Sequence, residues 1–219
     1  MRSRTVRLVA AAALAMAGLW WAAPAVQGQD APPEGWQVRT DRGGHGADAE
    51  GLSFVEMTPG FHVTTGPAGI FFHPDSTAQG TFRIESTTFL FDPGERNEGF
   101  GVFFGGRDLT GETQAYTYFL IRRDGSVLVK RRDGAETSTL TGWTKNDAVA
   151  TWEERDEADS SVQNDLAIEA GADELVFFVN GTEVARMPRV DQHVDGIVGV
   201  RVNHGLNLHV SSVRVTPGR

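Results

Sequence analysis

The sequence predicts an all-β protein, a two-sheet antiparallel jelly-roll sandwich, on the basis of three observations. Apolar and polar residues alternate with a period of two in short runs that Gly, Asn, Asp and Pro interrupt, as in half-buried strands. Two pairs of these runs are joined through Asn180-Gly181 and Asp124-Gly125, dipeptides that favour tight hairpin turns. No stretch after residue 30 shows a capped apolar stripe at helical spacing, so we expect very little helix.

About a dozen closely spaced strands are expected, a number typical of sandwiches and jelly rolls. In chain order they are Trp36–Arg39, Leu52–Met57, Phe61–Thr64, Gly69–His73, Gly80–Phe91, Phe100–Gly105, Ala115–Arg122, Ser126–Arg132, Val162–Glu169, Glu174–Asn180, Glu183–Met187, Gly196–Asn203 and Leu208–Val215. Asn180-Gly181 supplies the two positive-φ residues of a type I′ turn, and we expect the same design at Asp124-Gly125.

The N-terminus predicts export. Arg2, Arg4 and Arg7 precede an unbroken apolar run from Leu8 to Ala23, and small residues suited to cleavage follow, up to Gly28. The apolar run is short for a membrane-spanning helix, which needs about 20 residues, although an uncleaved anchor is the alternative. We therefore expect a signal peptide at 1–28, a flexible leader at 29–34 and a single β-sandwich domain at 35–219. The expected location is secreted or periplasmic, with no membrane contact after cleavage.

Composition excludes several classes of function. The 219 residues contain no Cys, which excludes disulfides, zinc–thiolate sites, iron–sulfur clusters and thiol nucleophiles. The formal net charge of −9 argues against a nucleic-acid partner, because phosphates require an excess of Lys and Arg. The sequence does not indicate an oligomeric state.

Several motifs follow one another in a distinctive order. They are Phe100–Gly106, Tyr116–Arg122, Ser126–Val129, Gly142-Trp143, Asn164–Glu169 leading into Leu175–Gly181, Gly196–Val202 and Val213–Val215. This order resembles the concanavalin A-like lectin/glucanase superfamily, including laminin-G-like domains, over roughly residues 80–216. Secreted domains of the 3-keto-disaccharide hydrolase type are also similar, but Asn97–Gly101 replaces their usual Gly-Asn-Ser-Gly-Ile strand. The resemblance implies a concanavalin A-like fold more than an activity, since the superfamily contains lectins, glycosidases, lyases and adhesion modules.

The alternation also predicts a binding face. On the strand 115–122, Tyr116, Tyr118 and Arg122 share one face, while Phe119 and Ile121 point to the core. Sugars are bound by aromatic platforms flanked by planar hydrogen-bonding groups. We therefore expect an aromatic and basic cleft on the concave sheet face, and the alternative is a merely solvated sheet. The predicted ligand-binding residues are Tyr116, Tyr118, Arg122, Arg83, Glu85, Lys130, Arg132 and Trp143.

Catalytic and metal motifs are weak. Glycosidases of this superfamily use a Glu-x-Asp-x-x-Glu strand. The only near match is Glu154–Asp159, which ends in Asp and has charged or small residues between its carboxylates, so we expect a solvated acidic loop. The same segment supplies the weak calcium candidates Glu154, Asp156 and Asp159, without the loop pattern that calcium sites favour. Polysaccharide-lyase motifs have only partial counterparts at Arg83–Glu85 and Gln114–Tyr116. We therefore expect no catalytic residues and no cofactor, with calcium as the alternative.

The preferred interpretation is a secreted lectin-like module that binds a glycan without catalysis. One alternative is a glycan-degrading enzyme of the same fold, either a glycoside hydrolase or a polysaccharide lyase. The other is a structural or adhesion sandwich with no small ligand. A resemblance of fold cannot separate these three, because function depends on the site and not on the scaffold.

Overall fold

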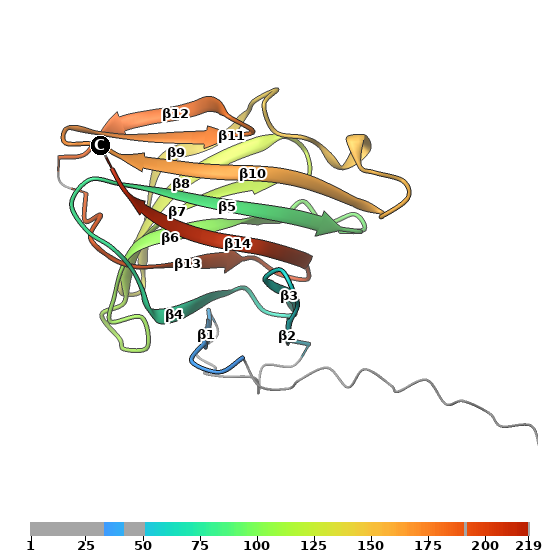
Figure 1. Ribbon diagram of the computed structural model, residues 1–219, viewed down its shortest axis with the longest axis horizontal. Helices are drawn as coiled ribbons and strands as arrows, with labels where there is room; N and C mark the ends of the chain where they lie inside the picture. The colour runs from blue at the N-terminus through green and yellow to red at the C-terminus, as the bar shows by residue number, and fades with distance from the viewer. Residues whose placement is uncertain (1–32, 42–50, 191, 219) are drawn as a thin grey trace, which may run out of the picture.

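The computed structural model describes residues 33–41, 51–190 and 192–218. Within these ranges the chain forms fourteen strands and one short 3₁₀ helix, η1 (Trp152–Glu154). The strands form two seven-stranded antiparallel sheets that pack face to face (Figure 1). The expected signal peptide lies outside the described residues. In the part of the chain that the structure describes, no helix is long and apolar enough to cross a membrane.

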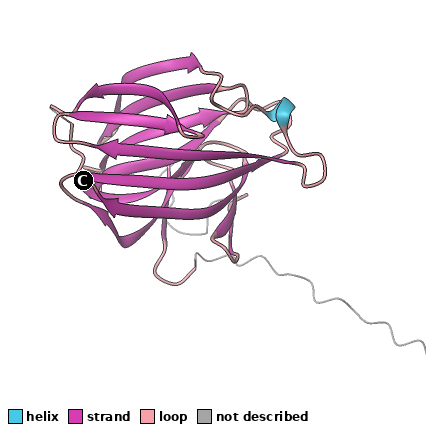
Figure 2. Ribbon diagram, turned by 45° about the horizontal axis from the view of Figure 1, so that its top comes forward, coloured by secondary structure: helices cyan, strands magenta, loops and turns pink. Residues whose placement is uncertain are grey.

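Each sheet combines strands from distant parts of the chain. Sheet A has the order β1 (Gln37–Thr40), β4 (Gly69–Ala78), β13 (Gly196–Val202), β6 (Gly99–Arg107), β7 (Ala115–Arg122), β8 (Ser126–Asp133) and β9 (Glu136–Lys145). Sheet B has the order β12 (Thr182–Pro188), β11 (Glu174–Val179), β10 (Ser161–Ala170), β5 (Phe82–Phe91), β14 (Asn207–Pro217), β3 (Phe61–Thr64) and β2 (Ser53–Glu56). Strands make up the body of the molecule, and loops and the short helix lie at its edges (Figure 2). The predicted all-β, two-sheet antiparallel sandwich is confirmed.

The main core lies between the two sheets. Strand β5 shows how alternation builds it, because Phe82 and Ile84 are buried between the sheets while Arg83 and Glu85 point outward. Full burial of one such apolar side chain stabilises the fold by about 1.5–3 kcal/mol. The largest buried residues of this core include Phe71, Phe100, Phe104 and Phe119 from sheet A and Ile84, Leu90, Ile168 and Phe177 from sheet B.

The two predicted hairpins differ in their turns. Asn180 and Gly181 have φ values of 49° and 79°, so the two-residue type I′ turn between β11 and β12 is confirmed. The turn between β7 and β8 is different, because only Gly125 has a positive φ, at 83°, and Asp124 does not. The Gly125 N–H donates to the Arg122 carbonyl at 3.1 Å, which gives a three-residue turn that ends in a left-handed glycine. The expectation of a second type I′ turn was therefore wrong.

Strand β9 was missed by the sequence analysis. Its residues are mostly exposed Thr and Ser with no apolar alternation, because it is the edge strand of sheet A. Threonine favours strands through its branched side chain, and this was the available signal. The omission matters because β9 carries Trp143 and places it beside β8.

Two asparagines attach the segment after β9 to the β10–β11 hairpin. The Asn164 Oδ1 accepts hydrogen bonds from the Ala150 N–H and from Asn180 Nδ2, both at 2.9 Å, and its Nδ2 donates to the Ala150 carbonyl at 3.0 Å. Asn180 Nδ2 also donates to the Ala148 carbonyl at 2.9 Å. The asparagines that carry the superfamily resemblance therefore bond backbone groups of the half-buried residues Ala148 and Ala150.

Candidate functional site

The outer face of sheet A carries a second apolar cluster, on the side away from sheet B. The outer face of an antiparallel sandwich is usually polar. Here the cluster is built from residues of β4, β6, β7 and β8 with one from the loop after β6, each at most 5% exposed. Its members are Ile70, Phe72, Phe103, Leu109, Tyr116, Tyr118, Leu120 and Leu128, with Trp143 and Ile197 packed against it. Several large apolar side chains are thus buried on the outer face of the sheet, which is usually polar and exposed to solvent.

The strand register places the predicted basic residues beside this cluster. Tyr116 lies opposite Arg132, and Tyr118 lies opposite Lys130, across the β7–β8 pair. Phe119 points into the main core, as the alternation predicted. The structure therefore confirms that Tyr116, Tyr118, Lys130 and Arg132 lie on one face of the sheet.

An ion pair between the buried Arg201 and the partly exposed Asp41 lies over the two tyrosines. Arg201 of β13 is 5% exposed, and its guanidinium donates to both carboxylate oxygens of Asp41, at 3.0 and 2.6 Å. It also donates to the Tyr116 hydroxyl at 3.1 Å, and its guanidinium carbon lies 5.1 Å from the Tyr118 ring centroid. Burial alone would raise the pKa of Asp41, but the hydrogen bond and charge of Arg201 outweigh it, so the pKa lies below its usual range. Asp41 is therefore ionised at neutral pH.

A tryptophan–arginine stack forms the other end of the site. The Arg122 guanidinium carbon lies 3.5 Å from the Trp143 ring centroid, within cation–π distance, and both side chains are half-buried. The edge of the Trp143 ring approaches Gly99 on β6, where an added Cβ would lie 2.9 Å from the ring. Glycine at this position therefore lets the ring lie close to the sheet.

The basic groups of this face are incompletely partnered. The Nε atoms of Arg122, Arg132 and Arg201 are buried, and none has a hydrogen-bond partner among the described residues. The Arg132 side chain is 15% exposed, and its Nη2 lies 3.9 Å from the Asp41 carboxylate, beyond hydrogen-bond distance. Lys130 is half-buried, and its side-chain ammonium makes no hydrogen bond or ion pair within the described part of the chain. From here on, "the basic face" means Arg122, Lys130, Arg132, Trp143 and Arg201 on the outer side of sheet A.

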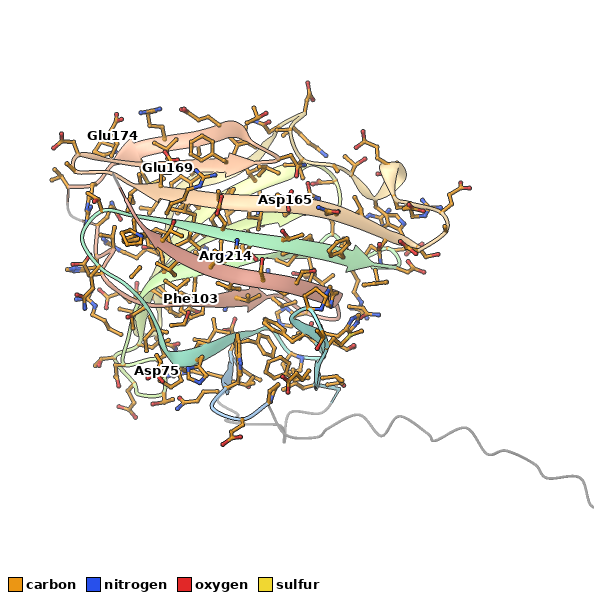
Figure 3. All side chains as sticks on the ribbon, viewed as in Figure 1. Asp75, Phe103, Asp165, Glu169, Glu174 and Arg214 are labelled. Atoms are coloured by element: carbon orange, nitrogen blue, oxygen red, sulfur yellow. The ribbon has the colours of Figure 1, made fainter. Side chains whose placement is uncertain are left out.

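Two predicted site residues belong elsewhere. Arg83 and Glu85 do point outward, but from β5 in sheet B, on the opposite side of the sandwich from Tyr116. Arg83 bonds Glu85 at 2.9 Å and Glu169 at 2.5 Å, and Glu169 lies on the neighbouring strand β10 (Figure 3). The expectation that Arg83 and Glu85 join the aromatic and basic cleft was wrong, since alternation indicates the face of a strand but not its sheet.

The tyrosines also differ from the expected open platform. Tyr116 is 2% exposed and Tyr118 is 5% exposed, so neither ring lies open to solvent. Phe103 and Arg201 pack against them, with a centroid distance of 5.2 Å between Phe103 and Tyr116. The half-buried Trp143 is the aromatic side chain of this group that solvent reaches.

The acidic segment after η1 is exposed, and its carboxylates are engaged locally. Glu154 accepts from the Thr151 N–H at 2.7 Å and from its hydroxyl at 3.0 Å. Asp156 accepts from the Ala158 N–H at 2.7 Å, and Asp159 is exposed. Residues 33–41, 51–190 and 192–218 contain no group of three or more His, Asp or Glu side chains placed to hold a metal ion.

Comparisons with known proteins identify the fold. No protein-family model and no curated protein matches the sequence. The structure is similar to the carbohydrate-binding module CBM66 from Bacillus subtilis, with 13% identity, a TM-score of 0.58, and coverage of 83% of this chain and 94% of that one. It is also similar to a GH16 protein of the Bacteroides ovatus mixed linkage glucan PUL, with 8% identity, a TM-score of 0.56, and coverage of 86% and 95%. The exoplasmic/lumenal domain of VIP36, in its Ca²⁺/Man3GlcNAc-bound form, matches with 10% identity, a TM-score of 0.57, and coverage of 84% of each chain.

The fold is a jelly-roll sandwich of the concanavalin A-like type. The expectation from the order of strand motifs is thereby confirmed for the architecture. Within this concanavalin A-like sandwich, sequence reasoning missed Asp41 and Arg201. The available signal for Arg201 was a single charged residue in the apolar strand 196–202, where Val200 and Val202 point to the core. Asp41 carried no local signal, because its partner lies 160 residues away in the sequence.

Proposed function

We propose that the basic face binds carbohydrate and that the protein is a lectin-like module without catalysis. The observation that carries this proposal is the half-buried Trp143 with Arg122 stacked on it, beside Lys130 and Arg132. An aromatic ring offers an apolar surface to the C–H face of a sugar, and neighbouring guanidinium and ammonium groups donate to its hydroxyls. Proteins of the same fold include one named as a carbohydrate-binding module and one named as mannose-bound, which supports this proposal.

The carboxylate bonded to Arg201 is unsuited to one of the two roles that glycoside hydrolysis requires. Glycoside hydrolysis requires two carboxyl groups, and one of them must hold a proton at working pH. The carboxylate beside Arg201 is Asp41, whose low pKa favours the ionised form, so it is unsuited to act as the acid. We propose on this basis that the site binds its ligand without cleaving it.

We further propose that the domain functions outside the cytoplasm. This rests on the basic start, the apolar run and the small residues of the segment 1–28. An exported glycan-binding domain has direct access to extracellular polysaccharides. Mass spectrometry of the protein recovered from an exporting host tests this proposal, and a mature N-terminus far from Gly28 would contradict it.

A glycan array tests the binding proposal. The variant is Trp143→Ala, and the matched control is Trp152→Ala, since Trp152 is also half-buried and carries a stacked arginine, Arg155, at 5.0 Å. We expect at least one glycan to bind the parent and the Trp152 variant, with about tenfold or greater loss for Trp143→Ala. Equal losses in both variants, or no glycan bound by the parent, would contradict the proposal. Release of reducing ends or unsaturated products would instead favour the enzyme alternatives.

A further inference from the structure

We propose, as an extension that rests on the proposed function, that the ligand of the basic face is an acidic glycan bearing carboxylate or sulfate groups. The first observation is charge. Arg122, Lys130, Arg132 and Arg201 lie on this face. Among the described residues, the carboxylate hydrogen-bonded to one of them is Asp41, on Arg201, while Asp108 and Asp133 line the hollow beside Arg132. The whole chain has a net charge of −9, so this concentration of positive charge opposes the overall composition.

The second observation is the set of unused donors. An N–H that is buried without an acceptor costs about 1–3 kcal/mol, so an uncompensated set of them is unfavourable in a stable fold. The Nε atoms of Arg122, Arg132 and Arg201 are such donors. Because these atoms are buried, a ligand meets the outer parts of the Arg122 and Arg132 side chains and not the Nε atoms themselves. Carboxylate and sulfate oxygens only accept hydrogen bonds, so they match the guanidinium and ammonium donors of this face.

The third observation is the availability of Lys130 and Arg132. Lys130 has no hydrogen bond or ion pair within the described residues. The Arg132 Nη2 remains 3.9 Å from Asp41, and its Nη1 makes one long bond, at 3.4 Å, to the Gly134 carbonyl. The cross-strand register puts these two residues on the same face of β8, opposite the two tyrosines of β7. Two neighbouring cations on one strand suit the repeated negative charges of an acidic polysaccharide.

Two other basic residues near this face are already neutralised or occupied. Lys145 pairs with Asp124 at 3.2 Å, and Arg39 donates to the carbonyls of Leu109 and Gly111. Asp124 and Glu98 are the acids near Arg122, at the end of the site away from Arg132. Among the described residues, the positive charge without a hydrogen-bonded carboxylate therefore lies at Lys130 and Arg132, with the exposed Arg107 beside Arg132.

The opposite face of the sandwich differs in charge. On sheet B, Arg83 is paired with Glu85 and Glu169, and Arg186 is paired with Glu174 and Glu183. Each of these bases therefore faces two carboxylates. Arg214 is exposed on the same face without an ion pair among the described residues, so sheet B has one such arginine where the basic face has several cations.

Paired polysaccharides that differ only in charge test the inference. The first arm compares polygalacturonate with its methyl-esterified form, and the second compares dextran sulfate with dextran, so that carboxylate and sulfate ligands are distinguished. We expect the charged member of at least one pair to bind about tenfold or more tightly than its neutral partner. Its affinity is expected to fall several-fold between about 50 mM and about 300 mM salt, because counterion screening weakens exposed charge pairs.

A charge-matched pair of double variants locates the effect. Lys130→Gln with Arg132→Gln removes two charges from the basic face, and Arg186→Gln with Arg214→Gln removes two from sheet B. We expect the first to lose about tenfold or more in affinity for the charged polymer and the second to stay within about twofold of the parent. Circular dichroism confirms that both remain folded.

The outcomes separate this inference from the proposed function. Equal binding of charged and neutral polymers, or equal losses in both double variants, would overturn the acidic-glycan inference. If a neutral glycan binds the parent and loses affinity in Trp143→Ala, the carbohydrate-binding proposal stands and only the acidic-glycan inference is refuted. If the parent binds no glycan in the array and no polymer here, the proposed function itself is refuted.

Discussion

Replacing Asp41 with Asn tests whether the ion pair over the tyrosines stabilises the fold. The amide introduced at position 41 would keep one acceptor for Arg201, but its NH₂ group would face a guanidinium N–H, so one charge-assisted hydrogen bond is lost. Such a bond contributes about 1.5–3 kcal/mol, and breaking a fully buried ion pair costs about 3–5 kcal/mol. The Arg201 side chain is 6% exposed but the Asp41 side chain is 29% exposed, so water compensates in part. We expect the free energy of unfolding at pH 7 to fall by about 2–3 kcal/mol.

The loss is expected to depend on pH in one direction. The pKa of Asp41 in the folded protein lies below its ordinary value of 3.8, so folding favours the ionised carboxylate. The stabilisation is therefore complete above the pKa of the unfolded chain, about 3.9, and is lost as the pH falls through the lower pKa of the folded state. The difference between parent and variant is thus largest near neutrality and narrows in acid.

Chemical denaturation at a series of pH values measures this difference. At pH 7 the expected loss corresponds to roughly 5–10 °C in melting temperature for a domain of this size. Asp75→Asn is the control, since the Asp75 side chain is 93% exposed, and we expect it to change stability by less than about 0.5 kcal/mol. If Asp41→Asn unfolds at the same denaturant concentration as the parent at pH 7, the ion pair does not stabilise the fold. A gap that stays constant or widens in acid would refute the pKa argument.

Three further substitutions test other parts of the structure. Gly181→Ala is expected to lower the free energy of unfolding by about 1 kcal/mol, because its φ of 79° strains any residue with a Cβ although the space around it is open. Gly142→Ala is the control, since Gly142 also has open space around it but no positive φ, and thermal denaturation should show a much smaller loss. Asn164→Ala is expected to lower the free energy of unfolding by about 1–3 kcal/mol, since it leaves the partly buried N–H and carbonyl of Ala150 without these partners. A loss below about 0.5 kcal/mol in chemical denaturation would contradict the role described. Gly99→Ala is expected to displace Trp143 and change its fluorescence, because the new Cβ would lie 2.9 Å from the ring, and an unchanged emission spectrum would show that the ring does not rest there.

Much of the candidate site was predictable because strand alternation is a local property. Tyr116, Tyr118 and Arg122 share a face with one another for the same reason that Phe119 faces the core, namely that successive side chains point to opposite sides. Lys130 and Arg132 follow from the short β7–β8 hairpin, whose turn sets the register between the two strands. These features depend only on residues that are close in the sequence, so they can be predicted from the sequence.

The rest of the site depends on contacts between distant segments. Arg83 and Tyr116 both point outward, but the crossing connections of the sandwich place β5 and β7 in different sheets. Likewise, Arg201 meets Asp41 across 160 residues, and the burial of the tyrosines depends on Phe103 and Arg201 packing over them.

Local alternation therefore specifies the strands, their inward faces and the tight Asn180-Gly181 hairpin. Only the assembled sandwich decides which outward faces combine and which donors remain without an acceptor. The physical reason is that a period of two orients each side chain relative to its own strand, whereas the neighbours of a strand are chosen by burial of the shared core. The unpartnered donors around Lys130 and Arg132 are a product of that second choice.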